Sequence, residues 1–295
     1  MSWIRDSSLT WTQLLMLKVL KCGNIPKHVA FIMDGNRRYA QKKNVQKVEG
    51  HSKGFDKLSE TLQWCLDLGI YEVTVYAFSI ENFKRSNDEV EALMDLARQK
   101  FKRLFDEKDK LMEQGVRIRM IGDRSLLPED IVSTVSQIEL MTRENKRAYL
   151  NVAFSYTSRN EITNAISKIC DGYERGELDD NDINEETLFS CIYTNESPPP
   201  ELMIRTSGEQ RLSDFLLWQT AYSYLYFTDV LWPDFTAWHL MAAVFHYQRA
   251  FKQLEEAKKQ KKIFNHNQPI SSKAEKFILS TKEQHWKAME LAVKT

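Results

Sequence analysis

The stretch HVAFIMDGNRRYA, residues 28–40, contains the transition that decides the fold. Its first half is a short apolar run of the kind that forms a buried strand. Gly35 and Asn36 follow, and both residue types tolerate the positive φ angles of a sharp turn. Arg37 and Arg38 then fall in the first turn of a predicted helix. A strand that turns directly into a helix is the opening of a βα unit.

Further apolar runs and helical segments repeat this pattern along the chain. Five more predicted strands cover residues 72–78, 116–122, 148–156, 202–208 and 224–230. Segments of helical period separate most of them, at residues 54–68, 89–112, 128–145 and 159–169. Alternation of strands and helices indicates an α/β fold, with a six-stranded, mainly parallel sheet covered on both faces. Ligands of such sheets bind beyond the carboxyl ends of the strands.

Composition places a limit on where a charged ligand can bind. The 295 residues, 42% of them hydrophobic, are enough for one large domain with a full core. The formal charge is zero, from 41 basic and 41 acidic side chains, so any phosphate site has to be a local cluster. Four cysteines lie far apart without a zinc-binding spacing, which favours a reducing compartment.

Two segments are expected to flank a central domain at residues 25–250. Residues 1–24 carry Trp and Leu side chains over a wide helical arc, and they predict an amphipathic helix that is too polar to span a membrane. Such a helix either lies in a membrane interface or packs on its own domain, and the sequence favours neither. Residues 251–295 are polar and helical with a break at Pro269. They predict a solvated helical hairpin in preference to a partner-docking element.

Asp34 stands where the first predicted strand ends, directly before the turn. A carboxylate at this point suits Mg2+ that is also held by phosphate oxygens, because Mg2+ takes only one or two carboxylates from a protein. The helix N-terminus that follows attracts anions, and the forks of Arg37 and Arg38 bind phosphate oxygens in pairs. Taken alone, the segment is explained equally well by a surface Asp-Gly turn with ordinary arginines.

Other strand ends bring more cations to the same edge of a parallel sheet. Arg85 follows the second predicted strand, and Arg205 and Arg211 follow the fifth. With the two arginines after the first strand they make five, which is too many for a chance grouping. Ser207 and Ser213 add small donors that suit a second phosphate group.

Two further side chains are candidates for the same site. Asn82, in FSIENFKRS, is placed to orient a proton or a water molecule. His51, in KVEGH, is expected at the end of the helix that begins at Arg37. A lone histidine is more often a structural residue, but beside phosphate-binding arginines a binding role is equally well supported.

Four linked motifs in consistent order resemble the cis-prenyltransferases: MDGNRRYA, YAFSIENFKR, RTSGEQRLSDFLLWQ and LWPDF. The resemblance covers about residues 27–246 and is greatest to the eukaryotic catalytic subunits of the family. It implies an enzyme that condenses isopentenyl diphosphate onto farnesyl diphosphate with Z stereochemistry, with Mg2+ as cofactor. It also implies a hydrophobic tunnel that holds the growing chain, and a long polyprenyl product that is the dolichol precursor for protein glycosylation.

The resemblance implies roles for individual positions. Asp34 holds the Mg2+ and helps the allylic diphosphate leave, Asn82 takes part in the chemistry, and Arg85 lies beside it. The residues implied for the allylic diphosphate are Gly35, Asn36, Arg37 and Arg38, with His51 nearby. Those implied for isopentenyl diphosphate are Arg205, Arg211 and Ser213. The base that removes a proton stays open between Asn82 and the substrate's own diphosphate.

Departures from the family pattern point to a second subunit. Arg37 replaces a glycine of the first motif, and Thr157, Ser158 and Arg159 stand where the family has G-G-R, as in the eukaryotic catalytic subunits. Asp234, in LWPDF, matches a carboxylate linked to metal binding. Single-subunit members end in an Arg-x-Gly motif, and none follows HYQRAF here. The resemblance therefore implies a Nogo-B-receptor-like partner that supplies this motif, and a peripheral position on the cytosolic face of the endoplasmic reticulum membrane.

Other classes of function are less well supported. Nucleotide binding has no motif, since neither GxxxxGK[ST] nor GxGxxG occurs. Stacking of nucleic acid on Trp218, Trp232 and Trp238 is disfavoured because their apolar flanks indicate core packing, so no nucleic acid is expected. The alternative functions are a non-catalytic or differently specific diphosphate-binding subunit of the same fold, and another phosphotransferase on this sheet type. The retained Asp34 and arginines disfavour a non-catalytic subunit.

Overall fold

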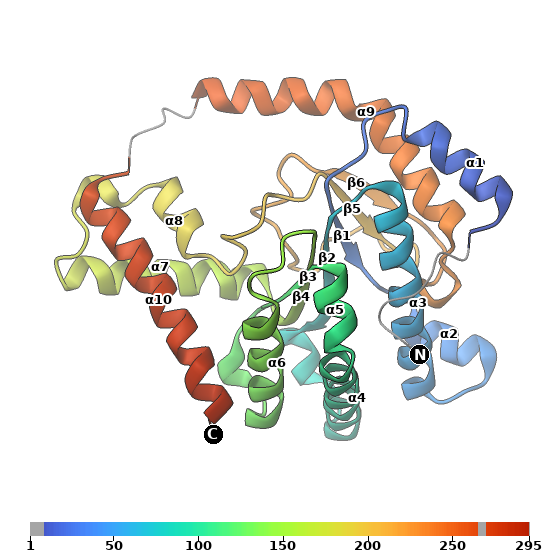
Figure 1. The fold of residues 1–295 in the computed structure, drawn as a ribbon, viewed down its shortest axis with the longest axis horizontal. Helices are drawn as coiled ribbons and strands as arrows, with labels where there is room; N and C mark the ends of the chain where they lie inside the picture. The colour runs from blue at the N-terminus through green and yellow to red at the C-terminus, as the bar shows by residue number, and fades with distance from the viewer. Residues whose placement is uncertain (1–8, 265–269, 295) are drawn as a thin grey trace.

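Within residues 9–264 and 270–294, which the computed structural model describes, six strands form one sheet (Figure 1). The strands are β1 (His28–Ile32), β2 (Glu72–Ser79), β3 (Val116–Ile121), β4 (Ala148–Tyr156), β5 (Leu202–Arg205) and β6 (Tyr224–Phe227). Their order in the sheet is β3-β4-β2-β1-β5-β6, and every neighbouring pair is parallel. Each strand coincides with a predicted apolar run, so the predicted α/β fold is confirmed.

Helices cover the sheet and connect its strands. They are α1 (Trp11–Leu20), α2 (Asn36–Lys43), α3 (Lys47–Leu68), α4 (Asn87–Asp106), α5 (Lys108–Gln114), α6 (Glu129–Thr142), α7 (Ser158–Glu174), α8 (Glu185–Cys191), α9 (Ala237–Phe264) and α10 (Ser272–Lys294). Side chains of a strand alternate between the two faces of the sheet. Phe31 and Val75 face a large core shared with α3, α4, α6 and α9. Ala30 and Ile32 face a smaller core, which the buried Phe215 of the segment after β5 covers.

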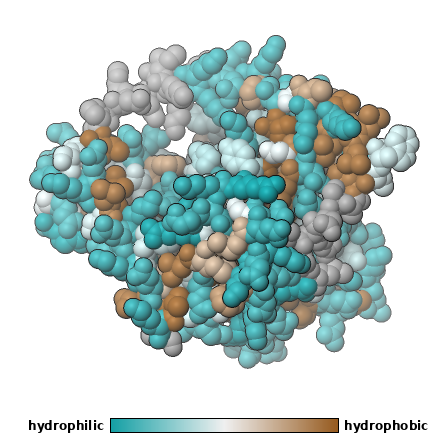
Figure 2. Space-filling view, in the orientation of Figure 1, coloured by the Kyte–Doolittle hydropathy of each residue, from teal (hydrophilic) through white to brown (hydrophobic). Residues whose placement is uncertain are grey.

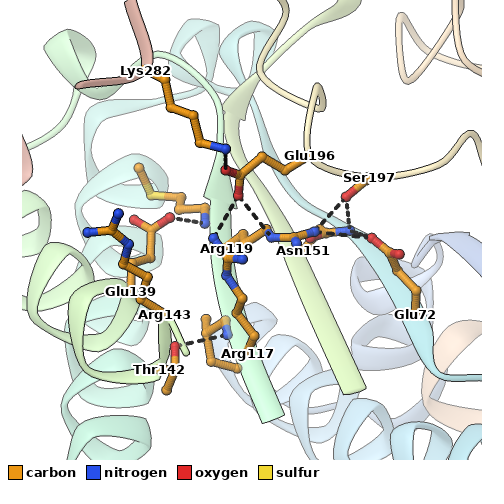
Figure 3. Close-up of polar contacts among 12 residues, drawn as sticks. Glu72, Arg117, Arg119, Glu139, Thr142, Arg143, Asn151, Glu196, Ser197 and Lys282 are labelled. Carbon is orange, nitrogen blue, oxygen red and sulfur yellow. Dashed lines mark hydrogen bonds and ion pairs between the residues drawn. The ribbon is translucent and has the colours of Figure 1, made fainter. Parts of the chain in front are cut away.

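The last helix, α10, is fastened to the amino half of the sheet by a polar network (Figure 3). Lys282 of α10 donates to Glu196 at 2.7 Å, and Arg117 of β3 donates to the same carboxylate at 2.7 Å. Nearby, Asn151 of β4 donates to Glu72 of β2 at 2.9 Å inside the protein. The Asn151–Glu72 pair is buried and has to be satisfied in this way. The contact with α10 is an ion pair in which Lys282 is 50% exposed, so it orients the helix but contributes little stability by itself.

Apolar contacts hold the same helix. Ala274, Phe277 and Met289 of α10 are buried, and Phe277 lies against Gly172 of α7, where an added Cβ would come within 2.5 Å of its ring. The prediction of a solvated hairpin is therefore wrong, because α10 packs on the body of the protein through α6, α7 and α8. Pro269, the predicted break, lies outside the described residues.

At the other end of the chain, α1 shows two different apolar faces. Thr10 caps the helix, and Leu17 and Leu20 are buried against α9 and α3. Trp11 and Val19 remain 77% and 60% exposed, and Figure 2 shows hydrophobic surface over α1 and the start of α9. The helix packs on its own domain, yet keeps an apolar face at the surface. Among the described residues, every helix is too short or too polar to cross a membrane.

The three tryptophans of the carboxyl half do not share one environment. Trp232 is fully buried, as predicted, and its ring lies 5.8 Å from that of Phe31. Trp218 and Trp238 are 36% and 44% exposed, so the prediction of core packing is wrong for these two. They lie in different elements, the loop after β5 and α9, and do not form a common stacking surface with the buried Trp232.

Candidate active site

The turn after β1 is fixed by close packing of two helices. Gly35 adopts a φ of 104°, and α2 begins at Asn36, so both arginines lie in its first turn as predicted. Helix α3 passes so near that a Cβ on Gly50 would lie 2.4 Å from the carbonyl oxygen of Asn36. A Cβ on Gly54 would lie 2.2 Å from Asn36 Oδ1. Only glycine permits this approach, which holds α2 and its arginines at the edge of the sheet.

The Asp34 carboxylate accepts two hydrogen bonds. Arg205 Nη2 donates to Oδ2 at 2.9 Å, and the Gly35 N–H donates to Oδ1 at 2.7 Å. Burial raises the pKa of Asp34, but the hydrogen bonds from Arg205 and Gly35 outweigh it and hold the pKa below its usual range. Asp34 is therefore ionised at neutral pH, with its side chain 36% exposed.

Arg205 ends β5 and organises the loop that follows it. Its guanidinium is only 3% exposed, and Nη1 donates to Ser213 Oγ at 2.7 Å and to the carbonyl of Arg211. Tyr76 donates its hydroxyl to the carbonyl of Ser213 at 3.2 Å. The loop predicted to bind the second diphosphate thus folds back onto Arg205, and its residues lie beside Asp34.

Glu209 joins the two predicted diphosphate sites. Arg38 of α2 donates to Ser207 Oγ, and its Nη2 lies 3.6 Å from Glu209 Oε1. Arg211 pairs with the other oxygen of the same carboxylate. Glu209 therefore bridges an arginine predicted for the first diphosphate and one predicted for the second.

Glu89 of α4 gathers the cations on another side of the site. Arg85 Nη1 lies 3.0 Å from its carboxylate, Lys47 Nζ 3.2 Å and Arg37 Nη1 3.7 Å. Partial burial raises the pKa of Glu89, but the hydrogen bond from Lys47 and the charge of Arg85 outweigh burial and hold the pKa below its usual value. The carboxylate therefore stays ionised at neutral pH. The sequence signal for this pairing was the four-residue spacing of Arg85 and Glu89.

His51 lies in the first turns of α3, which corrects its predicted position. The helix expected to run from Arg37 to His51 is two helices, because Asn44 adopts a φ of 54° and ends α2. Burial lowers the pKa of His51 to about 4, and the charges of Arg85 and Arg37 act in the same direction. The imidazole is thus neutral at pH 7, and its buried Nε2 has no hydrogen-bond partner among the described residues.

Asn82 lies in a single turn of 3₁₀ helix, Ile80–Lys84, directly after β2. Its Oδ1 accepts the backbone N–H of Ser79 at 3.0 Å, while the Ser79 hydroxyl accepts the N–H of Glu81 at 3.2 Å. This reciprocal cap holds the amide by its oxygen. The NH₂ group of Asn82 is then the part that remains to donate to a ligand.

Most of these side chains line one cavity of about 1040 Å³, at the carboxyl ends of the strands. Glu89 and Ser207, which pair with arginines of the cavity, are not among its lining residues. The predicted site residues that line it are Asp34, Gly35, Asn36, Arg37, Arg38, His51, Asn82, Arg85, Arg205, Arg211 and Ser213. Its apolar lining comes from α3, α4 and the sheet, and includes Leu58, Phe101, Val152 and Phe154. The volume is at the upper end of the roughly 300–1,000 Å³ of ligand pockets. A polar end and an apolar interior suit a diphosphate with a long hydrocarbon chain.

Several features of the site had no assignment from the sequence. Glu89 pairs with Arg37, and Glu209 pairs with Arg38, and only the fold brings these segments together. Asp214 and Arg159 also line the cavity and are paired with each other. Asp234, which the resemblance linked to metal binding, is exposed and is not among the residues that line the cavity.

The donor set at Asp34 fits a metal ion that arrives with a diphosphate. No group of three or more His, Cys, Asp or Glu side chains that could hold a metal occurs in the described part of the chain. Mg2+ commonly takes one or two carboxylates and completes its shell with phosphate oxygens and water. Asp34 supplies an ionised carboxylate at the cavity wall, amid arginines that attract phosphate.

The fold and the site define a class of enzyme. A family model described as "Putative undecaprenyl diphosphate synthase" matches residues 32–255. The chain therefore belongs to the cis-prenyltransferases, enzymes that transfer prenyl groups. A crystal structure of lavandulyl diphosphate synthase from Lavandula x intermedia, in complex with dimethylallyl diphosphate, matches with a TM-score of 0.72 and 36% identity. That match covers 76% of this chain and 95% of the other.

Curated relatives narrow the class further. The human dehydrodolichyl diphosphate synthase complex subunit DHDDS is 55% identical over 258 residues, covering 88% of this chain and 78% of the relative. A dehydrodolichyl diphosphate synthase complex subunit of Schizosaccharomyces pombe is 41% identical over 251 residues, covering 83% of this chain and 95% of the relative. Both names describe subunits of a complex.

Proposed function

We propose that this chain is the catalytic subunit of a dehydrodolichyl diphosphate synthase. It adds isopentenyl diphosphate units with Z stereochemistry to farnesyl diphosphate and makes the precursor of dolichol for protein glycosylation. The observation that carries the proposal is the convergence of the five predicted arginines and Asp34 on the polar end of one cavity with an apolar interior. The similarity to dehydrodolichyl diphosphate synthase subunits supports the choice of substrates.

In the proposed reaction, the arginines of α2 hold the diphosphate of the allylic substrate and offset the charge that develops as it departs. This is the dominant electrostatic term in such transfers. Asp34 is the protein ligand for Mg2+, which supplies Lewis-acid stabilisation of the leaving diphosphate when bound. The apolar wall excludes water from the allylic cation, which the double bond of isopentenyl diphosphate attacks.

The second diphosphate belongs, in this proposal, to the loop after β5. Arg205 and Ser213 are already hydrogen-bonded at 2.7 Å, so both donors are preorganised beside Asp34. His51 is neutral and its Nε2 is unpaired among the described residues, which suits a hydrogen bond to a phosphate oxygen. Asn82 orients the reacting groups by donating from its NH₂ group, since its oxygen is held by the Ser79 N–H. The proton lost in the condensation passes to a diphosphate oxygen of the substrate, because an amide NH₂ group cannot accept it.

A second subunit completes the enzyme in this proposal. The relatives are named as complex subunits, and the family's Arg-x-Gly motif does not occur after Arg249 in this sequence. A partner of the Nogo-B-receptor type would supply that motif. Apolar side chains that suit such an interface lie exposed just after the diphosphate loop: Leu217, Trp218, Tyr222 and Leu225 are 36–42% exposed.

The proposed place of action is the cytosolic face of the endoplasmic reticulum membrane, with peripheral attachment. The apolar face of α1 supports this proposal, since Trp11, Leu15 and Val19 are all more than half exposed. Such a face binds to the interface of a bilayer through buried apolar area. A long polyprenyl product also needs an apolar phase to receive it.

Incubation with labelled isopentenyl diphosphate, farnesyl diphosphate and Mg2+, with and without the partner subunit, tests the function. We expect long-chain polyprenyl diphosphate, at a higher rate with the partner, and loss of product on chelation. The matched control is Arg98→Ala, which removes a surface arginine paired with Asp130 outside the cavity. Binding of diphosphates without any product, even with the partner, would establish the non-catalytic alternative instead.

A further inference from the structure

The loop after β5, which carries Arg211, Ser213 and Asp214, is held by residues 157–159, the segment that replaces the family's G-G-R sequence. Thr157 caps α7, and the next residue, Ser158, donates its backbone N–H to the carbonyl of Asp214 at 2.8 Å. The Ser158 hydroxyl accepts the backbone N–H of Leu217 at 2.9 Å. The start of α7 therefore contacts the loop at two points along its backbone.

The side chain of Asp214 also contacts the start of α7. Its Oδ1 accepts the backbone N–H of Arg159 at 3.1 Å, and its Oδ2 accepts Arg159 Nε at 2.7 Å. The carboxylate is only 12% exposed, whereas the Arg159 side chain is 76% exposed. A carboxylate that receives a first-turn N–H also interacts favourably with the helix dipole. Asp214 is thus bound to α7 by its main chain and by both of its carboxylate oxygens.

The held loop is in a backbone conformation that needs support. Ser213, Asp214 and Leu216 have φ angles of 50°, 59° and 47°, in the left-handed region that non-glycine residues rarely occupy. Such residues persist only where surrounding contacts determine them. On its inner side, Ser213 is hydrogen-bonded to Arg205. The other contacts are those from Asp214 to the start of α7.

We infer that Asp214 is a positioning residue for isopentenyl diphosphate, acting through Ser213 and Arg211 by clamping their loop to the start of α7. This inference rests on the proposed function, which assigns that substrate to this loop. Asp214 does not itself need to touch the substrate. Its contribution is to keep the Ser213 hydroxyl and the Arg211 backbone in register with Arg205. The first diphosphate site, on α2, has no contact of this kind with Asp214 and depends on it much less.

A second contact, made by Phe215, holds the same loop on the protein independently of Asp214. Phe215 is fully buried, and its ring stacks on Tyr76 at 4.4 Å between centroids. This anchor keeps the loop attached when the clamp is removed. Loss of the clamp is therefore expected to disorient Ser213 and Arg211 without releasing the loop. We therefore expect a change in the KM for isopentenyl diphosphate, and not in the stability of the folded protein.

Steady-state kinetics of the assembled enzyme, with each substrate varied in turn, test the clamp. Asp214→Gly accepts the left-handed backbone but removes the carboxylate, and we expect the KM for isopentenyl diphosphate to rise about tenfold. The KM for farnesyl diphosphate should stay within about twofold. Asp214→Asn keeps an acceptor for the Arg159 N–H and tolerates the same backbone, so it should restore most of the affinity. Asp130→Asn, which breaks a surface pair with Arg98, is the matched control.

Arg159→Ala removes the guanidinium that pairs with Asp214 without changing the strained backbone. We expect a rise of about threefold in the KM for isopentenyl diphosphate, since the backbone half of the contact remains. Because Arg159 also lines the cavity, the double variant Asp214→Gly, Arg159→Ala should raise the KM no further than Asp214→Gly alone if the two residues act as one clamp. An unchanged KM in both Asp214→Gly and Arg159→Ala overturns the inference, as does an equal rise for both substrates. Arg211→Ala reports on the proposed function separately. If that variant leaves the KM for isopentenyl diphosphate unchanged, the substrate assignment of the loop fails rather than the clamp.

Discussion

Gly50→Ala is the substitution whose effect follows most directly from the geometry of the site. Alanine is favoured over glycine inside a helix by about 1 kcal/mol, so on propensity alone the change stabilises α3. Here the new Cβ would lie 2.4 Å from the carbonyl oxygen of Asn36, whereas real Cβ contacts essentially never fall below 3.0 Å. The first turn of α2 has to retreat by at least the difference, 0.6 Å. Overpacking of this kind costs about 1–3 kcal/mol, which exceeds the propensity gain.

We therefore expect Gly50→Ala to lower the free energy of unfolding by about 1 kcal/mol, or about 3 °C in Tm. Since α2 carries Arg37 and Arg38, we also expect kcat/KM for farnesyl diphosphate to fall about tenfold, because displacements near 1 Å cost up to about a hundredfold. Thermal unfolding and steady-state kinetics measure both effects. Lys53→Ala, an exposed position on the same helix, is the control. A variant that is more stable and fully active would refute the idea that this contact places α2.

Three further predictions concern other parts of the molecule. Asp34→Asn should lower activity at least about a hundredfold in the product assay. It should lower the free energy of unfolding by about 1–2 kcal/mol, less than for a fully buried pair because the Asp34 side chain is 36% exposed. Because the pKa of Asp34 is depressed in the folded protein, the native protein should be more stable than Asp34→Asn at neutral pH. This difference in the free energy of unfolding should disappear as pH falls through the folded-state pKa, as denaturation curves at several pH values would show. NMR titration should find His51 neutral down to pH about 4, and its pKa should rise when Mg2+ and pyrophosphate bind. An ordinary histidine pKa near 6.5 in the free protein would contradict the burial of its imidazole. Trp286→Ala removes the ring 4.1 Å from the guanidinium of Arg143 and should speed amide exchange in α10 while leaving kcat unchanged. Equal exchange in that variant and the native protein would show that the ring does not hold α10.

The strands could be predicted because each is a short apolar run, and such a run indicates a buried strand whichever strand lies beside it in the sheet. The site could be predicted in outline for a related reason. Carboxyl ends of parallel strands lie at one edge of the sheet, so the sequence could place Asp34, Arg85 and Arg205 at that edge. They approach one another because β1 lies between β2 and β5 in the sheet, which parallel strands alone do not require. The order β3-β4-β2-β1-β5-β6 itself was not predicted, because it depends on helix packing.

Two features were predicted wrongly because each depends on one residue or on a few contacts between distant segments. The break between α2 and α3 depends on a single left-handed residue, Asn44, in a stretch whose composition is helical throughout. The docking of α10 depends on a few buried side chains in a polar helix, such as Phe277, and on Lys282 reaching Glu196. Neither leaves a periodic signal strong enough to outweigh the surrounding lysines and glutamates.

The carboxylates of the site determine how its arginines act. Each arginine that binds a diphosphate has to exchange a protein carboxylate for phosphate oxygens, so the net binding energy is a difference between two ion pairs. Arg211 is 63% exposed and its partner Glu209 is partly exposed, so breaking this ion pair costs little free energy. For Arg205, 3% exposed and bound to Asp34, separation would strand a buried charge.

We therefore expect the two arginines of the same loop to behave differently when the second diphosphate binds. Arg205 keeps its bond to Asp34 and acts as a fixed donor, while Arg211 leaves Glu209 and closes on the ligand. Glu209 is then left facing Arg38, whose positive charge it offsets beside the first diphosphate. Through this carboxylate, occupancy of one site changes the charge around the other, although the chain as a whole is neutral.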